Sequence, residues 1–247
     1  MRKRADLLLV ERGLFESRAK ARAAIEAGGV TADGRPVGKA SDLLDEAAVV
    51  SATPAYPWVG RGALKLLGAL ELWPVEVAGG VVVDVGASTG GFTEVCLSRQ
   101  AARVYAVDVG RGQLHPRLAG DPRVVSLDAT DARDLTPALI PDAVDLIVTD
   151  VSFIGLAKAL PAALALARPG ADLLALVKPQ FEVGPQRVGK GGLVKDEAAQ
   201  AAALEGVKVF LEAAGWSVRA SADSPIAGGD GNREFLIWAQ KEAAARG

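Results

Sequence analysis

A glycine-rich turn follows a short apolar run in the stretch VVVDVGASTGGFTEV, residues 81–95. Glycine lets a backbone turn sharply and pass close to a bound molecule. In open α/β sheets, ligands bind beyond the carboxyl ends of the strands, which is where this turn would lie. Three kinds of chemistry use such turns: dinucleotide binding, ester hydrolysis by a serine nucleophile, and binding of a methyl donor.

The spacing within the turn weakens the first two interpretations. The dinucleotide fingerprint requires G-x-G-x-x-G, but Ser88 stands where the second glycine belongs. The segment Gly86-x-Ser88-x-Gly90 does fit the G-x-S-x-G elbow of α/β-hydrolases. Those enzymes need a histidine late in the chain, whereas the single histidine, His115, comes soon after the second apolar run. A hydrolase is therefore disfavoured.

Acidic residues mark the ends of three successive apolar runs: Asp84 in VVVDV, Asp108 in RVYAVD and Asp128 in RVVSLD. An acid about 20 residues beyond the glycine turn holds ribose hydroxyls in nucleotide-binding sheets, and Asp108 has this position. The series of three acids favours S-adenosylmethionine as the ligand. The candidate cofactor-binding residues are Asp84, Gly86, Ala87, Ser88, Gly90, Phe92, Asp108 and Asp128.

A second glycine-rich segment resembles a phosphate-binding loop but departs from it at the last position. Gly184-Pro-Gln-Arg-Val-Gly189-Lys190 is followed by Gly191, where Ser or Thr should bind magnesium. The segment KPQFE also separates it from the preceding strand-like run. We therefore expect a mobile loop over the active site instead of a nucleotide site.

The residues directly after the fourth strand-like run narrow the chemistry of the methyl acceptor. Enzymes that methylate base amino groups usually carry Asn/Asp-Pro-Pro-aromatic there, but Asp150-Val-Ser-Phe has neither proline. Methylation at a cytosine carbon needs a cysteine nucleophile, and we expect Cys96 to be packed on the helix after the turn. Methylation of a hydroxyl group remains open.

Three further charged residues stand in apolar surroundings. Lys65 lies within RGALKLL, Lys178 ends LLALV, and Glu234 begins EFLIWA. Taken singly, each is as readily explained by structure alone, since a lysine stem can cover apolar surface and a strand edge can carry a charge.

The elements that must position these residues alternate along the chain. Apolar runs at 81–85, 103–107, 124–127, 144–149, 173–177 and 235–238 predict strands. Helix-like stretches at 62–72, 157–167 and 196–214 separate them, which predicts an α/β fold with a parallel sheet covered on both faces. Before them, helices at 5–13 and 18–27 and a hairpin turn at Asp33-Gly34 predict a small α+β domain.

These patterns divide the chain into a small domain at 1–52, a Pro- and Gly-rich linker at 53–60, and a large domain at 61–247 that ends in a helical or frayed tail, KEAAARG.

Charge is distributed unevenly between the head and the rest of the chain. Residues 1–22 hold seven basic and three acidic residues, a net charge of 7 − 3 = +4, while the whole chain carries −2. A basic head suggests an anionic partner, although a solvated helix face would look the same.

One cysteine and one histidine in 247 residues exclude a disulfide framework and make a zinc site improbable, so we expect no metal. No stretch approaches the length of an uncharged membrane span, and a basic start interrupted by Asp6 and Glu11 is not a signal peptide. We expect a cytoplasmic protein.

Two family resemblances emerge from these segments. Lys65, Asp150, Lys178 and Glu234 resemble, in order and context, the K-D-K-E tetrad of the FtsJ/RrmJ-like ribose 2′-O-methyltransferases, whose sheet is the Rossmann-like class I methyltransferase sheet. The head, RADLLLVERGLFESRAKARAAIEAGGVTADGRPV, resembles an S4 RNA-binding domain. Together, joined by WVGRGALKL, they resemble the TlyA (hemolysin A) family of rRNA cytidine-2′-O-methyltransferases over nearly the whole chain.

The resemblance implies S-adenosylmethionine-dependent methylation of a ribose hydroxyl in ribosomal RNA or a ribosomal subunit, with 23S rRNA favoured and 16S rRNA open. It makes Lys65, Asp150, Lys178 and Glu234 the catalytic candidates, with Lys178 taking or steering the proton. It also makes the head an RNA-binding surface, with candidates Arg4, Arg18, Lys20 and Arg22. The alternative is a non-enzymatic RNA-binding or haemolysin-like protein.

Overall fold

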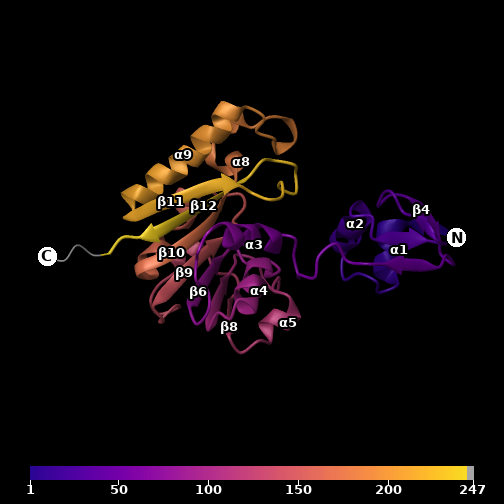
Figure 1. Cartoon of the computed structure of the whole chain (residues 1–247), viewed down its shortest axis with the longest axis horizontal. Helices are drawn as coiled ribbons and strands as arrows, with labels where there is room; N and C mark the ends of the chain where they lie inside the picture. Colours follow the sequence, from indigo (N-terminus) through magenta and orange to yellow (C-terminus); the bar gives the residue numbers. More distant parts are fainter. Residues whose placement is uncertain (244–247) are drawn as a thin grey trace. The chain divides into compact units, whose positions relative to one another are not determined.

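The computed structural model describes residues 1–243 and separates the chain into two compact units, Met1–Pro57 and the part from Trp58 onward (Figure 1). The expected tail at 241–247 begins at the last residue of a strand, and residues 244–247 lie outside the described part. Each unit has its own hydrophobic core.

The first unit packs two helices, α1 (Ala5–Glu11) and α2 (Arg18–Glu26), against short antiparallel strands. Strand β1 (Arg2–Arg4) pairs with β4 (Leu43–Asp45), while β2 (Val30–Ala32) pairs with β3 (Arg35–Pro36) and β5 (Val50–Ala52). Asp33 and Gly34 have φ of 49° and 74°, the left-handed pair that a tight hairpin requires, as predicted. The core residues include Leu9, Phe15, Ile25 and Val30.

The second unit is built on a seven-stranded sheet of order β11-β12-β10-β9-β6-β7-β8. Its parallel strands are β6 (Val81–Val85), β7 (Arg103–Val107), β8 (Val124–Leu127), β9 (Val144–Thr149) and β10 (Ala167–Val177). Strand β12 (Phe235–Lys241) runs antiparallel to both β10 and β11 (Trp216–Asp223). The strand order reverses at β6, so the carboxyl ends of β6 and β9 form the switch point where ligands bind in such sheets.

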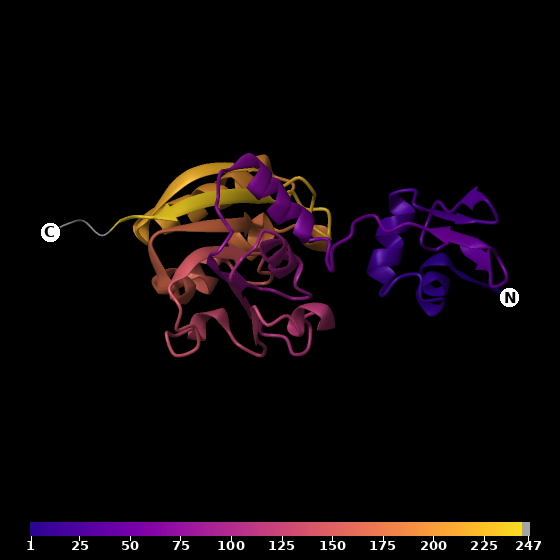
Figure 2. The ribbon, with the colours of Figure 1, turned by 60° about the horizontal axis from the view of Figure 1, so that its bottom comes forward.

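Helices cover both faces of this sheet (Figures 1 and 2). Leu66 of α3 (Ala63–Leu72), Phe92 of α4 (Gly91–Ser98) and Leu118 of α5 (Pro116–Ala119) share one apolar cluster. Helices α6 (Leu156–Ala159), α7 (Pro161–Leu166) and α9 (Glu197–Ala213) contribute to the other, and α8 (Pro179–Glu182) packs against α9. Neighbouring residues of β6, such as Val82 and Val83, point into opposite clusters, which is the period-two pattern of a strand buried on both faces.

Several elements differ from the sequence prediction. Strand β12 runs antiparallel to β10, so the sheet is mixed, whereas the sequence predicted a parallel sheet. The expected helix at 157–167 is divided into α6 and α7, because Pro161 has no N–H to continue the first helix. Strand β11 was not predicted: it is an edge strand in which exposed residues alternate with more buried ones, so it lacks a continuous apolar run.

Candidate active site

The glycine turn joins β6 to α4 at the carboxyl edge of the sheet. Gly86 and Ser88 have φ of 85° and 48°, and a Cβ built at Gly86 would lie 3.0 Å from Cγ1 of Val151. A side chain there would push the turn away from the segment that follows β9. Gly90 has φ of 96° and starts α4, where a Cβ would lie 2.3 Å from Leu118. The two glycines thus fix the shape of the turn by conformation and by close packing.

Asp108 connects this turn to the loop after β7. Its carboxylate accepts hydrogen bonds from the backbone N–H of Ser88, at 2.8 Å, and of Gly110, at 2.7 Å. The predicted position of this acid, at the end of the second parallel strand, therefore places it directly against the glycine turn. Asp108 also lines a cavity, as expected for a residue that could hold ribose hydroxyls.

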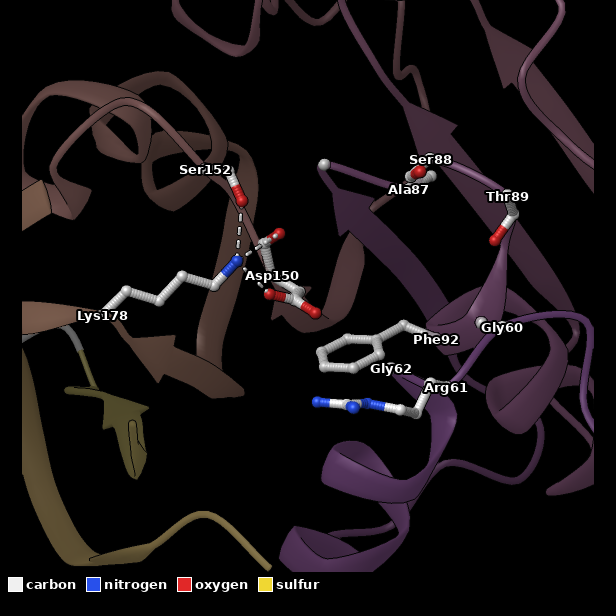
Figure 3. A pocket seen from close by; sticks show the side chains of 12 residues that line it. Gly60, Arg61, Gly62, Ala87, Ser88, Thr89, Phe92, Asp150, Ser152 and Lys178 are labelled. Carbon is white, nitrogen blue, oxygen red and sulfur yellow. Dashed lines mark hydrogen bonds and ion pairs between the residues drawn. The ribbon is translucent and has the colours of Figure 1, made fainter. Parts of the chain in front are cut away.

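Two adjoining cavities open at this edge. The larger has a volume of about 480 Å³ and a mostly apolar wall with Asp108, Gln113, Thr130 and Asp131 among its polar residues. The smaller, of about 220 Å³, is lined by Ala87, Phe92, Lys178 and the segment Gly60–Gly62 (Figure 3). Both cavities are lined by Gly86, Ser88, Asp150 and Ser152, so these residues form the boundary between them.

Two of the three predicted strand-end acids lie outside both cavity walls. Asp84 is buried within β6, and its carboxylate accepts a hydrogen bond from the Thr93 hydroxyl at 2.6 Å. Burial raises the pKa of Asp84 to about 7. Asp128 accepts hydrogen bonds from Gly112 N–H and the Ser126 hydroxyl. In this structure Asp84 anchors α4 and Asp128 shapes a loop, while Thr130 and Asp131, beyond Asp128, line the larger cavity.

The four residues of the predicted tetrad come together in one continuous chain of ion pairs. Lys65 of α3 lies 2.7 Å from Glu234 and 3.6 Å from Asp150, joining the residue before β12 to the residue after β9. Lys178, which follows β10, lies 2.6 Å from the other oxygen of Asp150 (Figure 3). Four segments far apart in the sequence are thereby linked at the edge of the two cavities.

The chain of ion pairs is buried and electrically balanced. Lys65, Lys178 and Glu234 are each less than a tenth exposed, and two ammonium groups face two carboxylates. Charges out of water are costly unless each is paired and hydrogen-bonded. The arrangement therefore holds two lysines in fixed positions beside the cavities.

Ser152 extends this chain and was not among the predicted site residues. Lys178 Nζ donates a hydrogen bond to the Ser152 hydroxyl at 2.8 Å and lies 3.5 Å from the backbone carbonyl oxygen of Asp150. The neighbouring Phe153 has φ of 68°, is 91% exposed and packs against Phe181 with ring centroids 5.2 Å apart. The only sequence signal for either residue was its place directly after Asp150.

The Trp58–Gly62 segment also contributes to the site, although residues 53–60 were expected to form a linker. Val59 is buried in the second unit, and its backbone N–H donates to Glu94 at 2.6 Å. Gly60 lines the smaller cavity, and a Cβ there would lie 2.8 Å from the Thr89 hydroxyl. Gly60 therefore lets the segment pass directly over the glycine turn.

The predicted RNA-binding residues lie on the first unit, each with an acidic partner. Arg4 and Arg18 both contact the buried Asp6, at 3.0 and 2.7 Å, and hydrogen bonds from Arg4 and Arg18 hold the pKa of Asp6 at about 2. Lys20 pairs with Glu16, and Arg22 with Glu26, one helical turn apart. Arg4, Arg18 and Arg22 line one surface depression.

A parallel sheet with a glycine turn and an acid-bearing second strand at its switch point is the architecture of a nucleotide-binding α/β enzyme. Comparison with known proteins makes this specific. Residues 58–241 match the FtsJ-like methyltransferase family, and residues 3–50 match the S4 domain. Of the helices in residues 1–243, none combines the length and apolar character that a membrane crossing requires.

Relatives match the S4 domain and the methyltransferase domain together, in one chain. The chain is 48% identical over 239 residues to the 16S/23S rRNA (cytidine-2′-O)-methyltransferase TlyA of Mycobacterium tuberculosis, which covers 96% of this chain and 89% of the relative. It is 33% identical over 234 residues to hemolysin A of Brachyspira hyodysenteriae, covering 94% and 98%. A solved structure of a hemolysin candidate from Streptococcus thermophilus matches with a TM-score of 0.78 and 37% identity over 98% of this chain and 90% of that one.

The chain therefore belongs to the FtsJ-like methyltransferases and, within them, to the S4-containing family that includes TlyA and hemolysin A. This confirms the predicted family, the fold class and the assignment as an S-adenosylmethionine-dependent methyltransferase.

Proposed function

We propose that the protein transfers a methyl group from S-adenosylmethionine to the ribose 2′-hydroxyl of a cytidine in ribosomal RNA. The observation that carries this proposal is the chain Glu234–Lys65–Asp150–Lys178, in which Asp150 lies in the wall shared by the two cavities and Lys178 lines the smaller one. The names of the relatives supply the target, since the Mycobacterium tuberculosis protein is a cytidine-2′-O-methyltransferase of 16S and 23S rRNA.

The larger cavity fits the adenosyl part of the cofactor. Its apolar wall suits a base, and Asp108 and Asp131 can accept hydrogen bonds from ribose hydroxyls. Gly86 and Ser88 stand where the two cavities meet, which suits the sulfur-bearing part of the cofactor, and Ala87 and Phe92 line the smaller cavity beyond. We assign Asp84, Gly90 and Asp128 the supporting role of shaping this site. When bound, S-adenosylmethionine supplies an electrophilic methyl group on a positively charged sulfur.

The lysines and acids would then act on the acceptor hydroxyl. A ribose 2′-OH is a weak nucleophile, so its oxygen must be aligned with the methyl carbon and must lose its proton as the bond to carbon forms. Lys178 is placed to orient that oxygen. A neutral Lys178 amine can take the proton as the O–H bond breaks, whereas the ammonium form, paired with Asp150, orients the hydroxyl and steers its proton to solvent water. Asp150 and Ser152 hold the ammonium group of Lys178, and Lys65 with Glu234 holds Asp150. The exposed ring of Phe153 offers a face on which a base can stack.

The S4 unit would hold the structured RNA. Arg4, Arg18 and Arg22 share a surface depression, and Lys20 lies on the same helix as Arg18 and Arg22. Acidic partners orient these side chains, while the exposed guanidinium groups of the three arginines can still meet phosphates. With a ribosomal subunit as the partner, we propose that the enzyme acts in the cytoplasm, and we favour 23S rRNA over 16S rRNA as the target.

Methyl transfer with tritiated S-adenosylmethionine tests this proposal. The substrates are 23S and 16S rRNA, as free RNA and as ribosomal subunits, from cells that lack the gene. We expect label in cytidine, at a position where the 2′-O-methyl group blocks alkaline cleavage of the next phosphodiester bond. Label on a base, or none in any of these substrates, would contradict the proposal.

A further inference from the structure

The segment between α8 and α9 carries positive charge that the chain of ion pairs and the two cavities do not use. Residues 184–195, GPQRVGKGGLVK, hold three cations and no acid, whereas the whole chain has a net charge of −2. Arg187, Lys190 and Lys195 are exposed, and within residues 1–243 no hydrogen bond or ion pair engages their side chains. We refer to residues 184–195 as the basic loop.

Two buried amide side chains hydrogen-bond to the basic loop, which we expected from the sequence to be a mobile loop over the active site. The backbone N–H of Val194 donates to Asn232 Oδ1 at 2.9 Å, and the carbonyl of Val194 accepts from Gln200 Nε2 at 2.7 Å. Asn232 also donates to the carbonyl of Gly192 at 2.9 Å. Asn232 is 2% exposed and Gln200 8% exposed. These buried amides stabilise the conformation of the loop, because polar groups removed from water must find hydrogen-bond partners.

The same contacts place the basic loop beside the chain of ion pairs. Asn232 lies two residues before Glu234, and a Cβ at Gly228 would lie 2.7 Å from the Glu234 carboxylate, so segment 228–234 wraps around that acid. At its other end the loop follows α8, which begins directly after Lys178. The loop after α8 and the loop before β12 lie at the same end of the sheet (Figures 1 and 2).

The loop does not have the features of a nucleotide phosphate site. It follows α8 instead of a strand, and Gly191, with φ of 76°, occupies the position where a hydroxyl would bind magnesium. Its cations instead point outward on exposed turns. Exposed cations next to a site for a polynucleotide match the charge of phosphodiesters, which lie one nucleotide apart along the RNA backbone.

We propose that the basic loop is a second RNA-binding surface, which contacts backbone phosphates next to the methylated nucleotide. This inference rests on the proposed function. The S4 unit then supplies affinity for structured RNA, and the basic loop sets the position of the target nucleotide against Lys178. Contacts of this kind carry no sequence information but fix the register of the RNA.

The test measures binding of the full-length protein to 23S rRNA over a series of salt concentrations. Each lost phosphate contact should lower the slope of log affinity against log salt by about 0.7–0.9. We expect Lys190→Ala to lower the slope by about one contact and the triple variant Arg187→Ala, Lys190→Ala, Lys195→Ala by about 2 to 3. The matched control is Arg99→Ala, an exposed cation after α4, at the opposite end of the parallel strands.

Each result has a distinct meaning. A lower slope together with a reduced kcat/KM for rRNA, and unchanged S-adenosylmethionine binding by calorimetry, supports the proposal. A slope equal to that of wild type and of Arg99→Ala overturns it, whether or not methyl transfer falls. If the wild-type protein itself methylates no ribose in rRNA, the proposed function fails, while the slope comparison on RNA still tests the basic loop independently.

Discussion

The ammonium group of Lys178 lies 2.6 Å from a carboxylate oxygen of Asp150, and both residues line the cavity next to the glycine turn. The two residues follow β9 and β10, which pair in parallel, so their backbones end at the same edge of the sheet. A lysine held this way has a fixed position without a large conformational cost at the moment of reaction. This geometry makes Lys178 the residue whose removal should affect chemistry most and binding least.

Lys178→Ala should reduce methyl transfer by at least about 100-fold, the lower range for a positioned proton-transfer group. Binding of S-adenosylmethionine and of RNA should stay close to wild type, because neither depends on this ammonium group alone. The measurements are single-turnover transfer of tritium, calorimetry and RNA binding. Lys208→Ala, which removes a lysine on α9 that pairs with Glu205, is the matched control. Near-normal turnover of the Lys178 variant would show that another group manages the proton.

The Lys65–Glu234 pair should matter for stability as well as for activity. Glu234→Ala leaves the buried Lys65 with only the more distant Asp150, and breaking a buried pair in this way costs about 3–5 kcal/mol. Replacing both partners by apolar residues, Lys65→Met with Glu234→Leu, should recover most of that free energy of unfolding. The double variant should then be stable in urea denaturation but inactive in methyl transfer. A stable double variant with normal activity would remove both residues from the catalytic proposal.

Most of the sheet could be predicted because its central strands are continuous apolar runs, as in Val81–Val85 and Val144–Thr149. Edge strand β11 could not, since one exposed side gives it no such run. The role of Ser152 could not be predicted from the sequence either. It depends on which strands are neighbours, and the pairing of β9 with β10 is a property of topology that no local pattern contains. Asp128 and Asp131 show the same limit: Ala129, with φ of 52°, turns the backbone between them, and only the later residue lines the cavity.

Asp108 and Asp128 provide a matched comparison for cofactor binding. Both follow a parallel strand and both accept backbone hydrogen bonds, but only Asp108 lines the larger cavity. Asp108→Asn should weaken S-adenosylmethionine binding by at least about tenfold, since each lost charge-assisted hydrogen bond to a ribose hydroxyl is worth about 1.5–3 kcal/mol. Asp128→Asn should change it only a few-fold. Calorimetric titration decides, and equal effects of the two substitutions would remove Asp108 from the cofactor site.

Asp84 should make the stability of the protein depend on pH. Its folded-state pKa, about 7, lies above the value of 3.8 for an exposed aspartate, so the folded state binds more protons between pH 4 and pH 7. The free energy of unfolding should therefore fall as pH rises through that interval and level off above it. Asp84→Asn removes the ionisation and keeps an acceptor for Thr93. We expect the variant to gain stability relative to wild type between pH 5 and pH 8 in urea denaturation. If the difference in free energy of unfolding between Asp84→Asn and wild type is the same at pH 5 and at pH 8, the raised pKa of Asp84 is contradicted.

The basic face of the S4 unit can be tested by comparing Arg22 with Arg18. Arg22 pairs with the exposed Glu26, and exposed pairs one helical turn apart are worth about 0.3–0.5 kcal/mol. Arg22→Ala should therefore leave the melting temperature nearly unchanged and lower the salt slope of rRNA binding by about one contact. Arg18 also contacts the buried Asp6, whose pKa is held at about 2 by hydrogen bonds from Arg4 and Arg18. Arg18→Ala should lower the salt slope by the same amount and also reduce stability.

The stability effect of Arg18→Ala has a pH signature that separates it from RNA binding. A carboxylate with a depressed folded-state pKa stabilises the fold above about pH 4, and this contribution is lost as pH falls towards 2. The difference in stability between wild type and Arg18→Ala should therefore shrink below pH 4, while Arg22→Ala shows no such trend. If both variants bind rRNA with the wild-type salt slope, these arginines serve only the fold of the S4 unit, and the RNA must be held elsewhere.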